Sequence, residues 1–334
     1  MPEQVLRQPL EEDPRRMKLA TIKDGSRDGR LVVVSRDLTQ MTDAAFLART
    51  LQAALDDWAR VAPHLATLAQ SLETGAVPAE RFHEHDAASP LPRAYQWIEA
   101  ATDAAGPDDG PELRQGASDA ILGPREPILA ADEAWGIDLG GGIAVITGDV
   151  PMGAAPAEAR EAIRLVMLVN AVALRGSPDS PAGTDGRHGA ASPAFSPVAV
   201  TPDELGDAWD GGQLGGTLCV DLHGKPLGRV DAGIGTRFDF PALIAGAART
   251  RRLTAGTIVG SGAIADRPEG GQGASIEAGG SGHSSLAGLR RAEAAGGGDP
   301  VTPFLGFGDT VRIEMLDERR HSIFGAIEQS VESA

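Results

Sequence analysis

The chain has 334 residues, 42% of them hydrophobic, which is typical of a soluble globular protein with a full hydrophobic core. Its 47 Asp and Glu residues outnumber its 30 Lys and Arg residues, and the resulting net charge of -17 argues against a nucleic-acid or anionic-membrane partner. A single cysteine, Cys219, excludes an intrachain disulfide, and no apolar run reaches the ~18 residues of a membrane span. We therefore expect a cytoplasmic protein.

The first part of the chain predicts an extension followed by a β-hairpin. Residues 1–16 are polar and charged and lack the apolar core of a signal peptide, so we expect a disordered extension. Residues 18–22 and 31–34 are mainly apolar and flank a turn-rich linker, KDGSRDG. Two such runs around a linker of this composition are typical of a hairpin.

A helical pattern follows the hairpin. Thr42 or Asp43 is expected to cap its first turn, Pro63 is expected to kink or end it, and a second helical segment is expected to run to about Leu72. The apolar residues that recur at helical spacing are Phe46, Leu47, Leu51, Leu55 and Trp58. Together with the hairpin, these helices predict a small N-terminal α/β domain over residues 17–85.

Two polar stretches after this domain contain groups that can bind metals. His83, His85 and Asp86 lie in a polar connection, where two histidines at i and i+2 are weak evidence for a metal site. A solvated linker is the better interpretation. Residues 98–116 are rich in Gly, Pro and acidic side chains and predict a solvated loop. The carboxylates of this loop are Asp103, Asp108, Asp109 and Glu112.

Residues 135–150 read WGIDLGGGIAVITGDV and predict a β-strand that turns at Thr147-Gly148-Asp149. Its start is unusual, because Gly140, Gly141 and Gly142 stand where a strand normally carries side chains. Three glycines supply no ligands and no packing, and they cost backbone entropy. Either a backbone approaches this stretch closely or side chains have been lost from it.

The frame W-G-I-D-x-x-x-x-x-A-V-x-T-G-D-V resembles the bacterial, two-domain branch of the fumarylacetoacetate hydrolase family. The resemblance implies a mixed α/β fold: the small N-terminal domain, then a mainly β C-terminal domain over residues 86–330 with a rolled, partly barrel-like sheet. It also implies a homodimer. The other matching segments are MKLATIKDGSRDGRLVVVS (17–35), TLQAALDDWA (50–59), LPRAYQW (91–97), LGPREPI (122–128), AFSPVAVTPDELGDAW (194–209), IVGSG (258–262) and residues 302–327.

The resemblance implies where the family's metal-binding and catalytic residues would lie, and this chain has Gly or Ala at those positions. The two glutamates of the family's Glu-x-Glu strand, which share one face and bind a divalent cation, fall on Gly140 and Gly142. A third ligand, an aspartate, falls on Ala171. A lysine and a substrate-binding threonine fall on Ala190 and Ala263. A hard cation needs oxygen ligands, so we expect no divalent-metal cofactor.

The rest of the chain predicts several further elements. A helix is expected to start at Pro156 and end near Gly176, and Cys219 is expected to be a buried structural thiol in a strand over residues 217–222. The buried stripe expected for that helix is Ile163, Val166, Met167 and Leu174. The other predictions are a helix over 240–251, a strand over 258–262, a hairpin from 310–316 and 322–328, and low-complexity loops over 177–192 and 266–298.

Three functions are consistent with this pattern. The first is a catalytically degenerate family member that binds a small molecule in the emptied cavity or acts as a structural or regulatory partner. The second is a repurposed, metal-independent lyase, isomerase or cyclase for a β-dicarbonyl compound, with Asp138, Asp185, His188 or His283 as acid or base. The third is an ordinary C–C bond hydrolase of the acylpyruvate or fumarylacetoacetate type. Expected partners are a small molecule and a second subunit, in a homodimer or a heteromer with an active paralogue.

Overall fold

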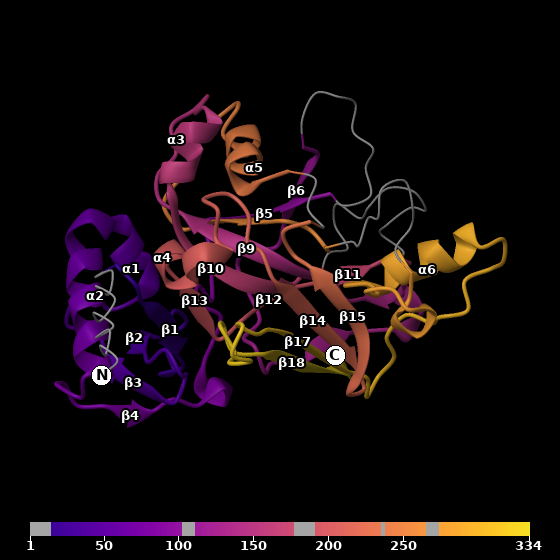
Figure 1. Cartoon of the computed structure of the whole chain (residues 1–334), viewed down its shortest axis with the longest axis horizontal. Coiled ribbons are helices and arrows are strands. Elements are labelled where there is room, and N and C mark those ends of the chain that lie inside the picture. Colours follow the sequence, from indigo (N-terminus) through magenta and orange to yellow (C-terminus); the bar gives the residue numbers. More distant parts are fainter. Residues whose placement is uncertain (1–14, 102–110, 177–190, 235–237, 265–273) are drawn as a thin grey trace, which may run out of the picture.

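The computed structural model describes residues 15–101, 111–176, 191–234, 238–264 and 274–334. Within these ranges the chain forms two large open β-sheets and one short two-stranded sheet, with helices beside them (Figure 1). The mixed α/β fold with a predominance of strands is therefore confirmed, but in the described part of the chain the rolled sheet does not close into a barrel. Of the extension predicted over residues 1–16, the first 14 residues lie outside the described ranges.

The larger sheet runs through both the N-terminal and the C-terminal parts of the chain. The predicted hairpin is confirmed, because β1 pairs with β2 along its whole length, and β1 pairs on its other edge with β13, so that Lys18 lies opposite Val200. The order of strands is β4 (Glu80–Arg81), β3 (Gln40–Asp43), β2 (Arg30–Val34), β1 (Lys18–Ile22), β13 (Val198–Val200), β10 (Ile163–Asn170), β9 (Gly141–Thr147), β16 (Thr257–Gly260), β5 (Gln96–Ala100) and β6 (Leu113–Gly116), and β12 (Ala194–Phe195) also pairs with β10.

The smaller sheet is formed entirely by strands of the C-terminal region, and one of its faces contributes to the hydrophobic core. Strand β18 runs parallel to β7, and all the other neighbouring strands of this sheet are antiparallel. The order is β15 (Lys225–Asp231), β14 (Thr217–Leu222), β17 (Thr310–Met315), β18 (Ile327–Ser333) and β7 (Ile128–Ala130). A separate short pair is formed by β8 (Ile137–Asp138) and β11 (Ala173–Leu174).

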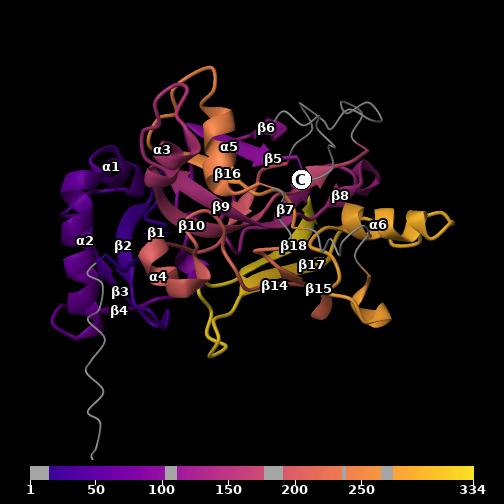
Figure 2. The same cartoon turned by 45° about the horizontal axis from the view of Figure 1, so that its top comes forward.

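The helices lie at several places around the two sheets, with α3 and α5 side by side (Figure 1). Helices α1 and α2 lie beside β1 to β3, and α6 projects at the far end in both views (Figures 1 and 2). The α-helices are α1 (Leu51–Asp56), α2 (Trp58–Glu73), α3 (Pro156–Glu161), α4 (Pro202–Leu205), α5 (Phe240–Ala247) and α6 (Leu286–Ala295). Short 3-10 turns are η1 (Glu84–Asp86), η2 (Glu133–Trp135), η3 (Gly206–Ala208) and η4 (Ile276–Ala278).

The helix predicted from Thr42 or Asp43 is wrong in its start and in its break. Thr42 belongs to β3, and α1 begins only after Thr50, whose side chain accepts a hydrogen bond from the Ala53 amide. The two helices are separated at Asp57, which has non-helical backbone angles, while Pro63 lies inside α2. Phe46 precedes α1 and is 72% exposed. Strand pairing of β3 with β2 thus outweighs the apolar spacing of this segment.

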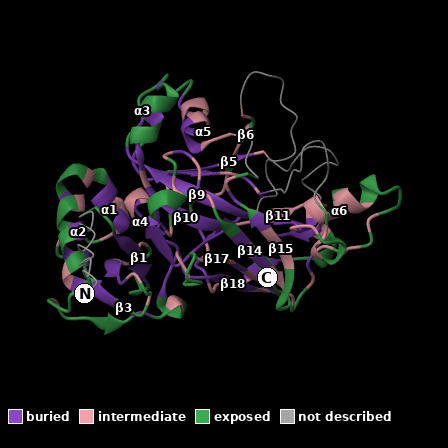
Figure 3. Cartoon of the chain, in the orientation of Figure 1, coloured by how far each residue is buried: buried purple, intermediate pink, exposed green. Residues whose placement is uncertain are grey.

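The stripe expected on a helix from Pro156 is also wrong beyond residue 161. Helix α3 does start at Pro156, but Ile163 to Asn170 form strand β10. This strand pairs with β9 on one side and with β12 and β13 on the other, and it is buried along almost its whole length (Figure 3). A strand buried on both faces reads as a continuous apolar run, which periodicity cannot distinguish from a buried helix.

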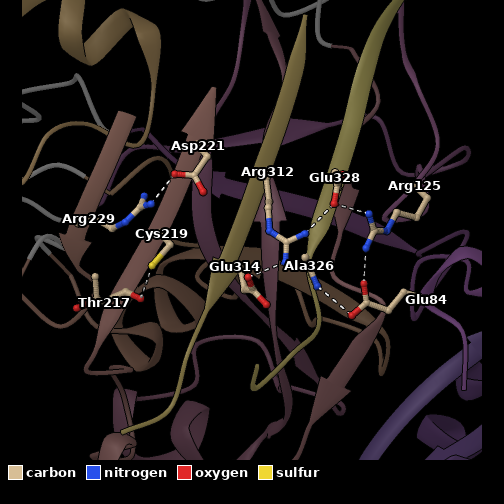
Figure 4. A network of polar contacts seen from close by, with 10 residues as sticks. All are labelled: Glu84, Arg125, Thr217, Cys219, Asp221, Arg229, Arg312, Glu314, Ala326 and Glu328. Atoms are coloured by element: carbon tan, nitrogen blue, oxygen red, sulfur yellow. Dashed lines mark hydrogen bonds and ion pairs between the residues drawn. The ribbon is translucent and has the colours of Figure 1, made fainter. Parts of the chain in front are cut away.

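A chain of ion pairs crosses the smaller sheet and reaches the connection expected to be a solvated linker (Figure 4). Arg312 of β17 binds Glu314 and Glu328, both at 2.7 Å. Arg125 binds Glu328 at 2.5 Å and Glu84 of η1 at 2.6 Å. The connection is therefore fixed to the sheet at Glu84.

Replacement of Arg125 by alanine is expected to lower the free energy of unfolding by about 1–2 kcal/mol, because two partly exposed ion pairs are lost. A double-mutant cycle with Glu84→Gln should give a coupling energy of about 1 kcal/mol in urea denaturation. Arg319→Ala is the control, because Arg319 is exposed and its side chain forms no ion pair with another described residue. A coupling energy of zero between Arg125 and Glu84 would show that this ion pair does not fix the connection to the sheet.

Cys219 lies on the outer face of β14, beside Asp221 and Arg229 (Figure 4). It is half-buried, so the expectation of a fully buried thiol is wrong. The buried residues of this strand are its neighbours Leu218 and Val220, because alternate residues point to opposite faces. Partial burial raises the pKa of the Cys219 thiol, which disfavours the reactive thiolate.

Buried charges also lie where β1, α2 and α4 meet. The ammonium of Lys18 donates to the carbonyl oxygen of Ile323 at 2.6 Å. The side chain of Glu204 is 9% exposed and lies 3.7 Å from Nε of Arg36, and its Oε2 has no hydrogen-bond partner among the described residues. Burial raises the pKa of the Glu204 carboxyl, although Lys18 and Arg36 act in the opposite direction.

This shift predicts a specific pH dependence of stability. The native protein holds the Glu204 proton more tightly than the unfolded chain, so unfolding releases a proton at pH values between the ordinary carboxyl pKa of 4.5 and the raised pKa of the native state. Wild-type stability should therefore fall relative to that of Glu204→Gln as the pH rises through this window. Urea denaturation from pH 4 to pH 7.5 measures this. Parallel stability curves for the two proteins would contradict it.

Candidate functional site

The triglycine at the start of β9 is packed against main-chain carbonyl groups. An ideal β-carbon on Gly140 lies 2.5 Å from the carbonyl oxygen of Ala171, and one on Gly142 lies 2.5 Å from that of Gly262. Real β-carbons do not approach backbone oxygens so closely, so a side chain at either position requires the backbone to move. The close backbone approach that the sequence offered as one explanation is therefore present.

Side-chain hydrogen bonds hold the two partners of the triglycine in place. The Gly140 amide donates to Oδ1 of Asn170 at 3.0 Å, and Nδ2 of Asn170 donates to Gln329 at 3.0 Å. On the other side, Oγ of Ser261 accepts from the Ile143 amide at 3.1 Å and donates to the Gly262 carbonyl at 2.7 Å. Gln329 lies in no motif of the sequence, whereas Ser261 belongs to the matching segment IVGSG (258–262), where nothing indicated the role of its hydroxyl group.

The positions singled out by the resemblance converge in space where the structure describes them. Gly140 contacts Ala171, and Gly142 contacts Gly262, the neighbour of Ala263. Ala171 and Ala263 are half-buried. Ala190 lies outside the described residues.

The segment 281–285 lies between β9 and β15 and joins the two sheets. On one side the Gly141 amide donates to the carbonyl of Ser284 at 2.8 Å, and on the other the His283 amide donates to Leu227 at 3.0 Å. An ideal β-carbon on Gly228 of β15 lies 2.3 Å from the His283 carbonyl oxygen. Glycines on both neighbouring strands thus allow this segment to pack in direct backbone contact.

Asp138 stabilises the beginning of helix α6. Its Oδ1 accepts the backbone amides of Leu286 at 2.8 Å and Ala287 at 3.2 Å, and its Oδ2 accepts Nε and Nη2 of Arg175 at 3.0 and 2.9 Å. The side chain is 1% exposed. Burial raises the pKa of this carboxyl, and the guanidinium and the two amides act against that effect. Four donors to two oxygens, with the helix N-terminus facing them, are the surroundings of an ionised carboxylate.

The remaining candidates for acid or base are divided. His283 is buried and lies three residues before Leu286, which binds Asp138. Ser284 and Ser285 are buried next to it, and Ser285 caps α6 through the Gly288 amide. Asp185 and His188 lie outside the described residues. The structure therefore brings Asp138 and His283 to the same end of α6 and leaves the other two unplaced.

Among the residues that the structure describes, those near the triglycine do not fit a divalent cation. Gly140, Gly142 and Ala171 provide no side-chain oxygen, and the carbonyl groups of Ala171 and Gly262 occupy the space beside the two glycines. Within the described ranges, no group of three or more His, Cys, Asp or Glu side chains is arranged to hold a metal ion. His85 and Asp86 lie in the exposed turn η1 and form no such group.

Two sequence families match the chain, in consecutive regions. Residues 17–93 match the fumarylacetoacetase N-terminal domain 2, and residues 91–332 match the fumarylacetoacetate (FAA) hydrolase C-terminal domain. No curated protein matches the sequence. No helix in the described ranges is both long and apolar enough to cross a membrane.

Solved structures share the fold over almost the whole chain. A fumarylacetoacetate hydrolase from the psychrophile Exiguobacterium antarcticum has a TM-score of 0.63 and 18% identity, covering 95% of this chain and 100% of its own. An HpcE protein from Mycobacterium smegmatis has a TM-score of 0.64 and 16% identity, with coverage of 95% and 100%. Maleylpyruvate hydrolase from Sphingobium sp. SYK-6 has a TM-score of 0.60 and 17% identity, again with 95% and 100% covered.

These likenesses are low in identity and show the fold, whereas the match over residues 91–332 spans most of the chain. It includes the triglycine strand, the segment 281–285, the strands of the smaller sheet, and the strands of the larger sheet from β5 onward. The protein therefore belongs to the fumarylacetoacetate hydrolase family.

Proposed function

We propose that this chain is a family member without the divalent-metal site, and that it acts by non-hydrolytic binding of a small molecule or of a partner protein. The observation that supports this most directly is the packing at Gly140 and Gly142, where a β-carbon would lie 2.5 Å from a carbonyl oxygen. Hydrolysis in the family relies on a hard cation to stabilise the enolate formed when the C–C bond breaks. This chain has no metal-binding carboxylates at positions 140, 142 and 171, and side chains at 140 and 142 would collide with the backbone. It therefore keeps the family fold without the metal-assisted hydrolysis.

The contacts of Asp138 agree with a structural role for the most buried acidic group near β9. A general acid or base must exchange its proton with a substrate within hydrogen-bond reach. Both oxygens of Asp138 are instead occupied by donors from α6 and Arg175.

A calorimetric titration with Mn²⁺ tests this proposal. The ion is a suitable probe because a maleylpyruvate hydrolase of the same fold, with a TM-score of 0.59, was solved in complex with manganese (II) and pyruvate. We expect no saturable heat. Tight stoichiometric binding would overturn the proposal and would make acylpyruvate-type C–C bond hydrolysis the leading function.

A repurposed, metal-independent enzyme is the second candidate, favoured by the buried position of His283 next to the Asp138-capped end of α6. Such an enzyme would exchange the acidic C–H protons of a β-dicarbonyl substrate through a side-chain base. Deuterium uptake by acetylpyruvate in D₂O, faster with wild type than with His283→Gln, would support it. Equal exchange rates for the two proteins would reject it.

For the quaternary structure we propose a homodimer, with a heteromer containing an active paralogue as the alternative. Light scattering of the purified chain separates them, because a homodimer gives twice the mass of 34.5 kDa. A monomer that remains monomeric when mixed with the paralogue would contradict both.

A further inference from the structure

A cavity of about 420 Å³ lies where the N-terminal hairpin meets the C-terminal region. The β1–β2 turn forms one wall, and the segments around residues 88–93 and 119–126 form the others. Its volume is in the range of small-molecule sites. None of its lining residues belongs to β9, β10 or α6, so this cavity is separate from the triglycine region.

The walls of the cavity are held by ion pairs that link distant parts of the chain. Arg93 binds Asp28 through two parallel hydrogen bonds of 2.8 and 2.6 Å, and its guanidinium holds the pKa of that carboxyl below its usual value. Lys23 binds Glu126 at 2.8 Å, and Glu126 also accepts the Gly123 amide at 3.0 Å. These four charges neutralise one another and fix the shape of the opening.

Two further charged side chains of the lining, of opposite sign, form no ion pair with a described residue. Arg27 and Asp119 both line the cavity, and neither makes an ion pair or hydrogen bond with another residue that the structure describes. Arg27 comes from the β1–β2 turn, whereas Asp119 follows β6, so they approach from different walls. The rest of the lining includes the small or apolar residues Ala88, Pro92 and Ile121.

We propose that this cavity binds a small zwitterion of the α-amino-acid class with an apolar side chain. The carboxylate of the ligand pairs with the Arg27 guanidinium, whose planar donors match a carboxylate. The ammonium group pairs with Asp119, and the side chain packs on Pro92 and Ile121. A ligand with only one charge leaves either Arg27 or Asp119 without a partner.

The ligand would touch both parts of the chain. Arg27 belongs to the region that matches the N-terminal family, and Asp119 to the region that matches the C-terminal one. A bound zwitterion therefore stabilises the junction of the two, in addition to the Lys23–Glu126 pair.

Calorimetric titration of the full chain with L-leucine tests the proposal. We expect saturable binding that Arg27→Gln and Asp119→Asn each weaken at least tenfold. Both residues are exposed, so both variants should keep the wild-type urea midpoint. Arg81→Gln is the matched control, because Arg81 is an exposed arginine of β4 outside the cavity, and it should bind L-leucine as the wild type does.

Two analogues of leucine that carry a single charge separate the zwitterion from simpler ligands. 4-Methylpentanoate keeps the carboxylate and 3-methylbutylamine keeps the amine, and both should bind at least tenfold more weakly than L-leucine. Binding of 4-methylpentanoate as tight as that of L-leucine would replace the proposal by an anion site at Arg27. Absence of saturable heat with L-leucine, or equal affinities of the wild type and both cavity variants, would overturn it. None of these results depends on whether the triglycine region binds Mn²⁺.

Discussion

Glutamates introduced together at Gly140 and Gly142 are expected to destabilise the protein by more than 4 kcal/mol and to leave it unable to bind Mn²⁺. A single β-carbon at Gly142 already meets a carbonyl oxygen at 2.5 Å, so Gly142→Ala alone should cost about 2–3 kcal/mol, as overpacking does in a core. The strand cannot give way easily, since β9 is paired with β10 on one side and β16 on the other. Urea denaturation and calorimetry measure both effects.

The matched control for this experiment is Gly298→Glu. An ideal β-carbon on Gly298 has no neighbour within 4 Å, so a glutamate there should change the stability by less than about 0.5 kcal/mol. If the double glutamate variant folds with wild-type stability and binds Mn²⁺, the triglycine region is an emptied metal site that can be refilled. In that case the metal ligands were lost while the space for their side chains remained.

Asp138→Asn is expected to lower the free energy of unfolding by about 3 kcal/mol, because it removes the charge that faces Arg175 and the amides of α6. The damage should be concentrated in α6, and hydrogen exchange of the Leu286 and Ala287 amides should accelerate. Asp132→Asn is the control: Asp132 caps η2 through the Ala134 amide but is exposed, so its loss should cost well under 1 kcal/mol.

A catalytic Asp138 would behave in the opposite way. Groups held for catalysis are commonly strained or poorly solvated, and their replacement often leaves stability unchanged or higher. Wild-type stability of Asp138→Asn, combined with a loss of proton exchange on acetylpyruvate, would therefore assign the residue to chemistry.

The parts of the fold that could be predicted are those fixed by neighbours in sequence. The hairpin of β1 and β2 follows from two apolar runs around a turn, and β9 from the run after the triglycine. Helix α6 could not be predicted, since it lies in a stretch rich in Gly, Ala and Ser. Its first turn is stabilised by Asp138, 148 residues earlier in the chain. No local pattern contains that contact.

The candidate site divides in the same way. The glycines and alanines at 140, 142, 171 and 263 could be recognised in the sequence, and for the triglycine a close backbone approach was one of two explanations. Which carbonyl groups fill the space could not be predicted, because Gly142 meets Gly262 across a loop far along the chain. Likewise Arg27 and Asp119 become neighbours of one cavity only through the folding of distant segments around it.

The pairing of β1 with β13 has a consequence for synthesis on the ribosome. The Met17 amide donates a hydrogen bond to the side chain of Thr201, 184 residues further along the chain. The edge of β1 that pairs with β13 therefore stays unpaired until that segment has been translated. At 5–20 residues per second the delay is roughly 10–40 s. During this time an unpaired, apolar strand edge is open to other nascent chains, which favours aggregation. Yield should thus depend on chaperone supply and on slow growth at low temperature more than on the stability of the finished protein.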